Sequence, residues 1–450
     1  MFRYVNHKAA RLYQNSLVRG GLVVGVSILL GNISGFFRII ITAYLLGTHA
    51  HADALAVATG PIDIFNSVVM NTMLFAFVPT LMLRPEAERP AIFARSLRVF
   101  APILLVASLG VFVFSSALTT FLGPGLAAEQ HDQAALLFRI LAPSILFAGL
   151  SAVCCALLYS ERRFLIPGLY QVCLNGATIV AALTLWKSFG IYGFAAGFTA
   201  GGALHLAITW TATAKLRGDH SPAVISAHEL LTRPAIFLLY AGLIAANVVV
   251  TRAFATHAGS GMAAAFDYSM RCVNVVVAYL VYPAASTLVP EIARLKGRDE
   301  VQQCYRLIAR SSRLMAMAAL GATAAGMLLR TPVIQLLFEH GSFTAESTRV
   351  VSGVFLGLAP SLLGGALLDL LARCFFALDR PKLPLLAAFV PVCVNLALTS
   401  FLRASGWLSD PTMLGLGASA GLLAGFLVLM TMIRVGRRGE ALPHEILQAS

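Results

Sequence analysis

Arginine and aspartate residues occur inside long apolar stretches of this sequence, where charge is costly and usually serves a function. On insertion scales each such side chain costs about 2.5 to 3.5 kcal/mol, so it is expected to face a water-filled cavity or an ionic partner. A guanidinium forms paired, charge-assisted hydrogen bonds to phosphate oxygens, and a carboxylate can bind a cation. The residues concerned are Arg38, Asp63, Arg252, Asp267, Arg271, Asp369 and Arg373, with Asp53 and Arg139 near the outer ends of their stretches.

Arg38 and Arg271 are the leading candidates for binding an anion. Arg38 lies eight residues before the end of the first apolar stretch, and Arg271 lies nine residues into the eighth. Because a helix rises 1.5 Å per residue, both are expected about 12 to 14 Å below the outer membrane surface. Two guanidinium groups at one depth, from different halves of the chain, would suit a diphosphate. Arg252 is a third candidate ligand.

A purely structural interpretation of these charges stays open. Each arginine could pair with a membrane carboxylate and only fix helix packing, and the internal repeat described below places Asp63 opposite Arg271. Asp369 and Arg373 are four residues apart on one helix face, which favours an internal pair. The residues that could line a cavity or bind a coupling ion are Asp53, Asp63, Asn66, Asn274 and Asp369.

No motif in the sequence indicates catalysis, a metal or a cofactor. The histidines of His49-Ala50-His51 have no acidic or cysteine cluster nearby apart from Asp53, so a solvated loop is expected. For His205 a packing role is the favoured interpretation and a proton relay the alternative. The outward loops are short and hold few carboxylates, and no nucleotide-binding glycine loop occurs. The chain is therefore not expected to be an enzyme, and its seven cysteines imply no disulfide framework.

The elements that must position these residues are membrane-spanning helices. Of 450 residues, 58% are hydrophobic and only 12% charged, whereas soluble domains carry about 25% charge. The recurring apolar stretches are long enough to cross a hydrocarbon core of about 30 Å. An all-α polytopic fold of about twelve spans follows, at 17–46, 54–82, 99–121, 134–158, 164–186, 191–214, 235–254, 262–289, 314–337, 350–376, 385–401 and 413–433.

The distribution of basic residues predicts the orientation. Most of the 33 Lys and Arg lie in the N-terminus, in every second loop and in the C-terminus, which places both termini on the cytoplasmic side of a bacterial inner membrane. The net charge of +13 is thus explained by topology, and no nucleic-acid partner is expected. Residues 1–16 predict a helix on the cytoplasmic surface, and 435–450 a cytoplasmic tail. The first stretch is too long for a signal-peptide core, so it is expected to be retained.

An internal parallel repeat, with an offset of about 208 to 224 residues, divides the chain into two lobes of six spans. The lobes are expected at 17–218 and 234–434, with a linker at 219–233 and a pseudo-two-fold axis along the membrane normal. Glycines four residues apart in the sixth and twelfth spans are expected to let helices approach closely. The matching pairs are Thr48-His49-Ala50 with Thr256-His257-Ala258, Val78-Pro79 with Val289-Pro290, Glu161-Arg162 with Asp379-Arg380, Pro167 with Pro384, Asn175 with Asn395, and Gly193, Gly197 and Gly201 with Gly417, Gly421 and Gly425.

Several of these residues belong to motifs that resemble those of the MurJ/MviN lipid II flippases, and the resemblance covers nearly the whole chain. It implies the multidrug/oligosaccharidyl-lipid/polysaccharide exporter fold, with two lobes around a central cavity, alternating access and a substrate of undecaprenyl diphosphate carrying sugars. Arg38, Asp53 and Arg271 match charged positions that the family uses. The motifs are Gly35-Phe36-Phe37-Arg38, Leu46-Gly47, Ala52-Asp53-Ala54, Pro61, Ala76-Phe77-Val78-Pro79, Tyr268 with Arg271, Leu288-Val289-Pro290-Glu291 and Gly341-Ser342-Phe343-Thr344-Ala345.

The chain also departs from that family. Asn32 stands where lipid II flippases typically have an arginine, Phe65 and Asn66 replace a basic pair, and Met270 replaces an aspartate. Lipid II flippases usually carry two spans beyond the twelve expected here. These departures favour a lipid-linked exopolysaccharide or other surface-glycan unit as the substrate over the peptidoglycan precursor.

The leading hypothesis is a flippase that moves an undecaprenyl-diphosphate-linked oligosaccharide, a surface polysaccharide unit or a lipid II-like precursor, to the outer leaflet by alternating access. One alternative is a cation-coupled drug or metabolite antiporter of the same superfamily, with Asp63 or Asp369 as the ion site. Another is a non-transporting scaffold of a glycan-synthesis complex. The expected partners are the lipid-linked glycan and membrane lipids, with glycan-synthesis enzymes as candidate protein partners.

Overall fold

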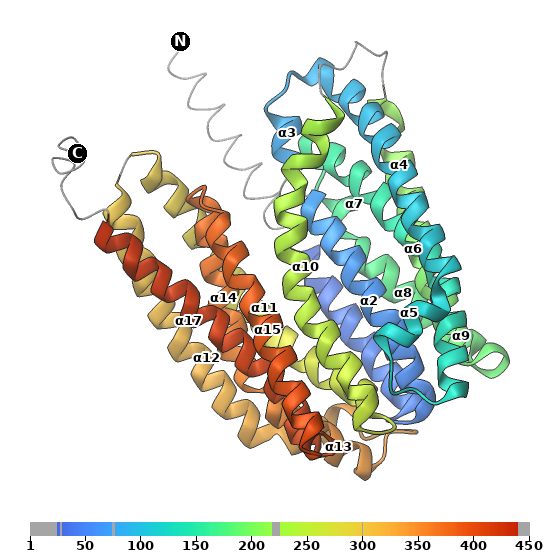
Figure 1. Ribbon diagram of the computed structural model, residues 1–450. Coiled ribbons are helices and arrows are strands. Elements are labelled where there is room, and N and C mark those ends of the chain that lie inside the picture. Colours follow the sequence, from blue (N-terminus) through green and yellow to red (C-terminus); the bar gives the residue numbers. More distant parts are fainter. Residues whose placement is uncertain (1–24, 28, 74–76, 218–225, 299, 440–450) are drawn as a thin grey trace, which may run out of the picture. The chain divides into compact units, whose positions relative to one another are not determined.

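The computed structural model describes the chain except residues 1–24, 28, 74–76, 218–225, 299 and 440–450, and the described part consists of helices with short connections (Figure 1). The predicted interfacial helix at 1–16, part of the predicted linker and most of the predicted tail lie outside the described residues. The prediction of an all-helical polytopic fold is confirmed.

Eleven helices among the described residues are long and apolar enough to cross a membrane. They overlap every predicted span except the second, where α2 (Ala50–Thr72) is followed by the short α3 (Val78–Met82), and the predicted third and tenth spans are each divided between two helices. The α2 helix has 23 residues, which is long enough to span, and it carries the polar residues Asp53, Asp63 and Asn66. The eleven are Gly25–Leu46, Glu86–Val113, Ala128–Ser160, Tyr170–Phe189, Ile191–Leu216, Leu238–Ala258, Met262–Lys296, Val301–Phe338, Pro360–Ala377, Lys382–Ala404 and Pro411–Ile433.

The chain forms two compact units. The first comprises Met1–Thr42, Ala58–Thr119 and His131–Leu238, and the second comprises Ala43–Val57, Thr120–Gln130 and Leu239–Ser450. Two segments from the N-terminal half of the sequence, Ala43–Val57 and Thr120–Gln130, thus pack with the second unit.

The first unit is built around α6. Its helices are α2, α3, α4 (Arg89–Val113), α5 (Ser115–Leu122), α6 (Ala128–Ser160), α7 (Leu165–Gly168), α8 (Tyr170–Phe189) and α9 (Ile191–Thr213), together with Gly25–Leu46 and the start of α10 (Ala227–Ala258). Within the apolar window of α6, 72% of the residues are buried, more than in any other candidate span. A core cluster that includes Phe77, Phe93 and Leu157 joins α6 to α4 and to the region around α3.

The second unit is built around α14. It contains most of α10, then α11 (Met262–Lys296), α12 (Val301–Phe338), α13 (Ala345–Leu358), α14 (Pro360–Ala377), α15 (Lys382–Ala404), α16 (Pro411–Leu414) and α17 (Leu416–Gly439). The α14 helix packs on α11, α12 and α17, and 61% of its apolar window is buried. The helices α6 and α14 correspond to the fourth and tenth predicted spans, so the most buried helix occupies the same place in each repeat.

The ends of α6 and α14 confirm the repeat and correct its register by one residue. Arg162 and Asp379 follow these helices with φ of 57° and 56°, the two positive values among the described non-glycine residues. The next residue donates its backbone N–H back into the helix in each case, Arg163 to Leu158 at 2.8 Å and Arg380 to Phe375 at 3.0 Å. Arg162 therefore matches Asp379, whereas the sequence comparison had matched it with Arg380.

A buried asparagine also plays the same part in both repeats. In α8, the Asn175 amide donates to Gly31 O at 3.4 Å and to Ser34 Oγ at 3.2 Å on the first helix of its unit. In α15, the Asn395 amide donates to the backbone oxygen of Asn247 at 2.9 Å, within α10. Each amide thereby fixes the fifth helix of a repeat to the first by a hydrogen bond that lipid cannot replace.

The glycine ladders bring helices close together, as predicted. The α8 and α9 helices pack along one another, and so do α15 and α17 (Figure 1). A Cβ built at Gly197 would lie 2.5 Å from Ala181 Cβ, and one at Gly201 would lie 2.7 Å from Leu174 Cα. At Gly421 it would lie 2.5 Å from Pro391 O. These contacts are van der Waals packing of the kind that associates helices in lipid.

We expect Gly197→Ala to destabilise the protein even though alanine favours helix formation by about 1 kcal/mol. The added methyl group must displace α8, at a cost of about 1 to 3 kcal/mol. Gly176→Ala on α8 is the matched control, because a Cβ there meets no atom within 4 Å. The midpoint of thermal unfolding of the purified chain should fall for the first variant and hold or rise for the second. Equal midpoints would contradict the proposed close packing.

Candidate functional site

Arg38 is held inside the first unit by one carboxylate and one aromatic ring. Its Nη2 donates to Asp63 Oδ2 at 2.8 Å, and its guanidinium carbon lies 5.7 Å from the centre of the Phe198 ring. The two charged side chains are 16% and 27% exposed. The pair therefore lies in a partly open environment, where an ion pair exchanges partners more readily than in a sealed core.

The partner of Asp63 is thus Arg38, from its own unit. This contact agrees with the interpretation that each arginine pairs with a membrane carboxylate and only fixes helix packing. However, a guanidinium has five N–H donors. Among the described residues, the bond to Asp63 is the one hydrogen bond of the Arg38 side chain. Most of its donor capacity is consequently still available to a second anion.

Asn66 lies one turn beyond Asp63 on α2 and is fully buried. Its amide donates to Ser144 Oγ of α6 at 3.3 Å, and its Oδ1 makes no hydrogen bond within the described part of the chain. Asp63 thus contacts Arg38, whereas Asn66 contacts Ser144 on α6. Phe198 was not anticipated from the sequence, because an aromatic residue on an apolar helix carries no signal of a cation nearby.

Arg271 lies nine residues after the start of α11. Its side chain is half-buried. Asn274 lies three residues further, on the same helix face, and is exposed. The second unit therefore carries a cation and an adjacent amide, well inside a membrane-spanning helix.

Arg252 is engaged within the second unit. Its Nε and Nη2 both donate to Asp267 Oδ1, at 2.9 Å and 2.7 Å, and its side chain is only 7% exposed. This two-bond contact joins α10 to α11, and within the described part of the chain the buried Nη1 of Arg252 makes no hydrogen bond. Arg252 therefore contributes to helix packing, and its role as a third ligand stays a prediction.

Asp369 and Arg373 form the internal pair expected from their spacing. Arg373 Nε donates to Asp369 Oδ1 at 3.0 Å, and its Nη2 donates to Oδ2 at 3.2 Å. The Arg373 guanidinium also lies 5.3 Å from the Tyr282 ring centre. Asp369 therefore has its charge balanced on its own helix.

Asp53 binds the N-terminus of α11. Its Oδ2 accepts the Gly261 N–H at 2.5 Å, and its Oδ1 accepts the Ala264 N–H at 2.9 Å. The side chain is 2% exposed. A carboxylate is favoured here because the first N–H groups of a helix lack intrahelical partners and carry partial positive charge. Asp53 is thus occupied by backbone donors, which leaves little of it for a coupling ion.

The remaining polar candidate, His205, is packed inside the first unit, as the favoured interpretation predicted. The two ring nitrogens of His205 lie 3.0 Å from Ser151 Oγ and 3.2 Å from Ile166 O. Cys154 and Cys155 are buried free thiols. Within the described part of the chain, no three His, Cys, Asp or Glu side chains gather where they could hold a metal.

The sequence of this chain is similar to those of known proteins. The family described as lipid II flippase MurJ matches residues 42–449. A probable lipid II flippase MurJ of Rhizobium meliloti (strain 1021) is 27% identical over 450 residues, covering 95% of this chain and 83% of the relative. The lipid II flippase MurJ of Burkholderia cenocepacia is 24% identical over 435 residues, covering 92% and 84%.

Solved structures agree on the fold. A lipid II flippase MurJ in an inward closed conformation matches with a TM-score of 0.80 at 19% identity, covering 92% of this chain and 87% of that one. An inward-facing multidrug resistance MATE family transporter of the MOP superfamily matches with a TM-score of 0.76 at 13% identity, covering 92% and 97%. At these identities the likeness establishes the fold alone, which is the one that the sequence motifs implied.

The family match covers most of the chain, and both curated relatives align along nearly all of it. The fold agrees with the same assignment, and the expectation of a membrane transporter rather than an enzyme is confirmed. The chain belongs to the MurJ lipid II flippase family.

Proposed function

We propose that this chain flips an undecaprenyl-diphosphate-linked oligosaccharide from the inner to the outer leaflet of the bacterial inner membrane, with both termini cytoplasmic. The observation that carries the proposal is Arg38, a partly exposed guanidinium deep in a membrane-spanning helix, held by a single 2.8 Å bond to Asp63. The names of the relatives, lipid II flippases, support a lipid-linked substrate.

Arg38 and Arg271 are the two residues proposed to hold the diphosphate. In the empty transporter Asp63 balances the charge of Arg38. An arriving diphosphate supplies two phosphate groups with more acceptors than one carboxylate, so it competes for the guanidinium and releases Asp63. The exchange keeps the Arg38 guanidinium paired with an anion but leaves the Asp63 carboxylate without its cation, a cost that the contacts to the diphosphate must exceed.

The oligosaccharide is proposed to be a surface polysaccharide unit or a lipid II-like precursor. The position of Asn66, where a basic pair is usual, supports the surface glycan. Asn66 is fully buried and its amide is bonded to Ser144, so this position offers no second cation to a phosphate.

The membrane potential supplies a driving force for this direction of transport. With the inside negative, moving about two negative charges outward gains roughly 4 to 5 kcal/mol per 100 mV. A separate ion gradient is then unnecessary for the outward step, whereas resetting the empty carrier could use one.

Reconstitution tests the proposal. The full chain in liposomes is given polyprenyl diphosphates that carry a fluorescent label on either a lipid II-like muropeptide or a neutral oligosaccharide. Label that reaches the opposite leaflet becomes accessible to a membrane-impermeant quencher. We expect protein-dependent flipping of at least one substrate, accelerated by a potassium-diffusion potential of the favourable sign.

The same liposomes distinguish a flippase from the two alternatives, an antiporter and a scaffold. Export of a cationic dye driven by a sodium or proton gradient, without diphosphate flipping, would identify an antiporter and overturn the proposal. No movement of either class by monodisperse, correctly folded protein would favour a scaffold and also overturn it.

A further inference from the structure

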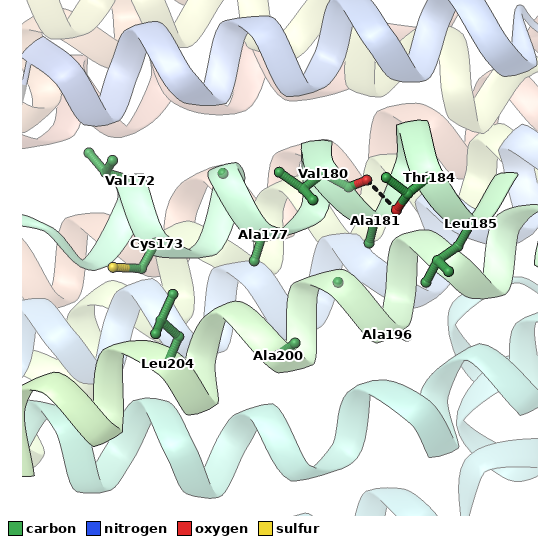
Figure 2. Close-up of a pocket in the computed structure, with 12 residues that line it drawn as sticks. Val172, Cys173, Ala177, Val180, Ala181, Thr184, Leu185, Ala196, Ala200 and Leu204 are labelled. Atoms are coloured by element: carbon green, nitrogen blue, oxygen red, sulfur yellow. Dashed lines mark hydrogen bonds between the residues drawn. The ribbon is translucent and has the colours of Figure 1, made fainter.

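A shallow groove runs along the paired helices α8 and α9 in the first unit. It encloses about 630 Å³ between Val172 and Leu185 on α8 and between Ala196 and Leu204 on α9 (Figure 2). Its lining is small and apolar, and the one hydroxyl, that of Thr184, is satisfied by Val180 O at 2.7 Å. At 1.5 Å per residue the groove extends about 20 Å along α8 and about 12 Å along α9, which is comparable to one leaflet of a 30 Å hydrocarbon core.

Gly176 keeps this groove open without serving the packing of the helices. A Cβ at Gly176 would meet no atom within 4 Å, unlike one at Gly197, which packs against Ala181. Glycine in a helix costs about 1 kcal/mol relative to alanine. The close approach of α8 and α9 explains Gly197 but not Gly176, and the open space at Gly176 is part of the groove.

A basic residue, Lys187, lies on α8 two residues beyond the last residue that lines the groove. Cys173, Ala177, Val180, Thr184 and Lys187 follow one another at three- and four-residue steps along α8, so Lys187 continues the stripe that lines the groove. Lys187 is exposed and lies in the last turn of the helix. On the predicted orientation it lies at the outer leaflet, where few of the Lys and Arg residues are found.

We propose that the groove between α8 and α9 binds one hydrocarbon chain of an anionic phospholipid whose phosphate lies beside Lys187. An apolar groove within membrane-spanning helices suits a hydrocarbon chain, and one ammonium group matches the single negative charge of a phosphodiester. The polyprenyl diphosphate proposed as substrate carries more negative charge than one lysine balances. The site is therefore assigned to a membrane phospholipid, and this assignment is independent of the proposed function.

Native mass spectrometry of the purified full chain tests the site, with phosphatidylglycerol and phosphatidylcholine supplied in equal amounts. We expect retention of at least one phosphatidylglycerol by the wild-type chain. Lys187→Gln should lower the preference for phosphatidylglycerol about fivefold, the effect of one basic residue on an anionic lipid headgroup. Gly176→Leu should remove one bound lipid of either kind, because the leucine side chain fills the groove. Lys187→Arg, Gly176→Ala and Gly242→Leu are the controls, since Gly242 on α10 also has open space around it.

Retention of the same number of lipids by Gly176→Leu and by the wild-type chain would overturn the proposal, and so would an unchanged lipid preference in Lys187→Gln. A change of oligomeric state in Gly176→Leu, without loss of lipid, would assign the groove to a second copy of the chain instead. If Gly176→Leu is not monodisperse, Val180→Trp fills the same groove, because Val180 is 60% exposed and has room for a larger side chain.

Discussion

Replacing Arg38 by alanine is expected to slow flipping of a diphosphate-linked glycan about 10- to 100-fold. The estimate corresponds to the loss of one hydrogen-bonded contact with a charged group, about 1.5 to 3 kcal/mol. The substitution also leaves Asp63 in a membrane-spanning helix without the guanidinium that lies 2.8 Å from it. The initial rate in proteoliposomes, per mole of folded protein, measures the effect.

A second substitution separates the binding role of Arg38 from its packing role. In the Arg38→Ala/Asp63→Asn double variant no uncompensated charge is left, because the ion pair is removed as a whole. We expect this variant to recover most of the thermal stability lost by Arg38→Ala, while flipping stays slow. Recovery of flipping along with stability would show that Arg38 only fixes helix packing.

Arg373→Ala provides the matched control. Arg373 is also an arginine of an apolar helix paired with an aspartate, but that aspartate is on its own helix, four residues away. Flipping by Arg373→Ala should therefore stay within a few-fold of the wild-type rate, and Arg38→Lys should be intermediate because an ammonium makes no paired bonds to phosphate.

The helical architecture was predictable because lipid allows few solutions. A chain with 12% charged residues and recurrent apolar stretches must satisfy its backbone within each span, which restricts it to helices. The repeat could be predicted from the pair Asn175 and Asn395 and from the glycine ladders, because these residues make equivalent helix contacts in each unit. Its register at Arg162 could not, because backbone hydrogen bonds set this turn and neither arginine nor aspartate indicates a positive φ as a glycine would.

The partners of the membrane charges were only partly predictable. Spacing along one helix identified Asp369 with Arg373, because residues four apart always lie on the same face. The pairs Arg38 with Asp63 and Arg252 with Asp267 join different helices, so they depend on rotations and depths that sequence periodicity does not fix. The role of Asp53 was missed for a similar reason, since its donors are backbone groups, which have no sequence signature.

Asp53→Ala is expected to cause the largest loss of stability among single substitutions of the membrane carboxylates, about 2 to 7 kcal/mol. Two backbone N–H groups, of Gly261 and Ala264, would lose their acceptor at a buried helix end. An orphaned buried donor costs about 1 to 3 kcal/mol, and the negative charge itself stabilises the helix N-terminus by a further 0.3 to 1 kcal/mol. Midpoints of thermal unfolding, compared at one scan rate, report the change.

Asp410 is the control for Asp53, because it caps a helix at an exposed position. The comparison separates the effect of burial from the effect of helix capping. Its carboxylate also accepts a helix N-terminal N–H, that of Thr412 at 2.8 Å, but at an exposed position where water can replace it. Asp410→Ala should therefore cost at most about 1 kcal/mol. Asp53→Asn should cause a loss of stability between those of the two alanine variants. The asparagine oxygen still accepts one backbone N–H, but its NH2 group faces the other backbone N–H and cannot accept a hydrogen bond from it. Equal effects at the two positions would mean that the α11 N-terminus is hydrated rather than dependent on Asp53, and that this carboxylate is free to act elsewhere in the transport cycle.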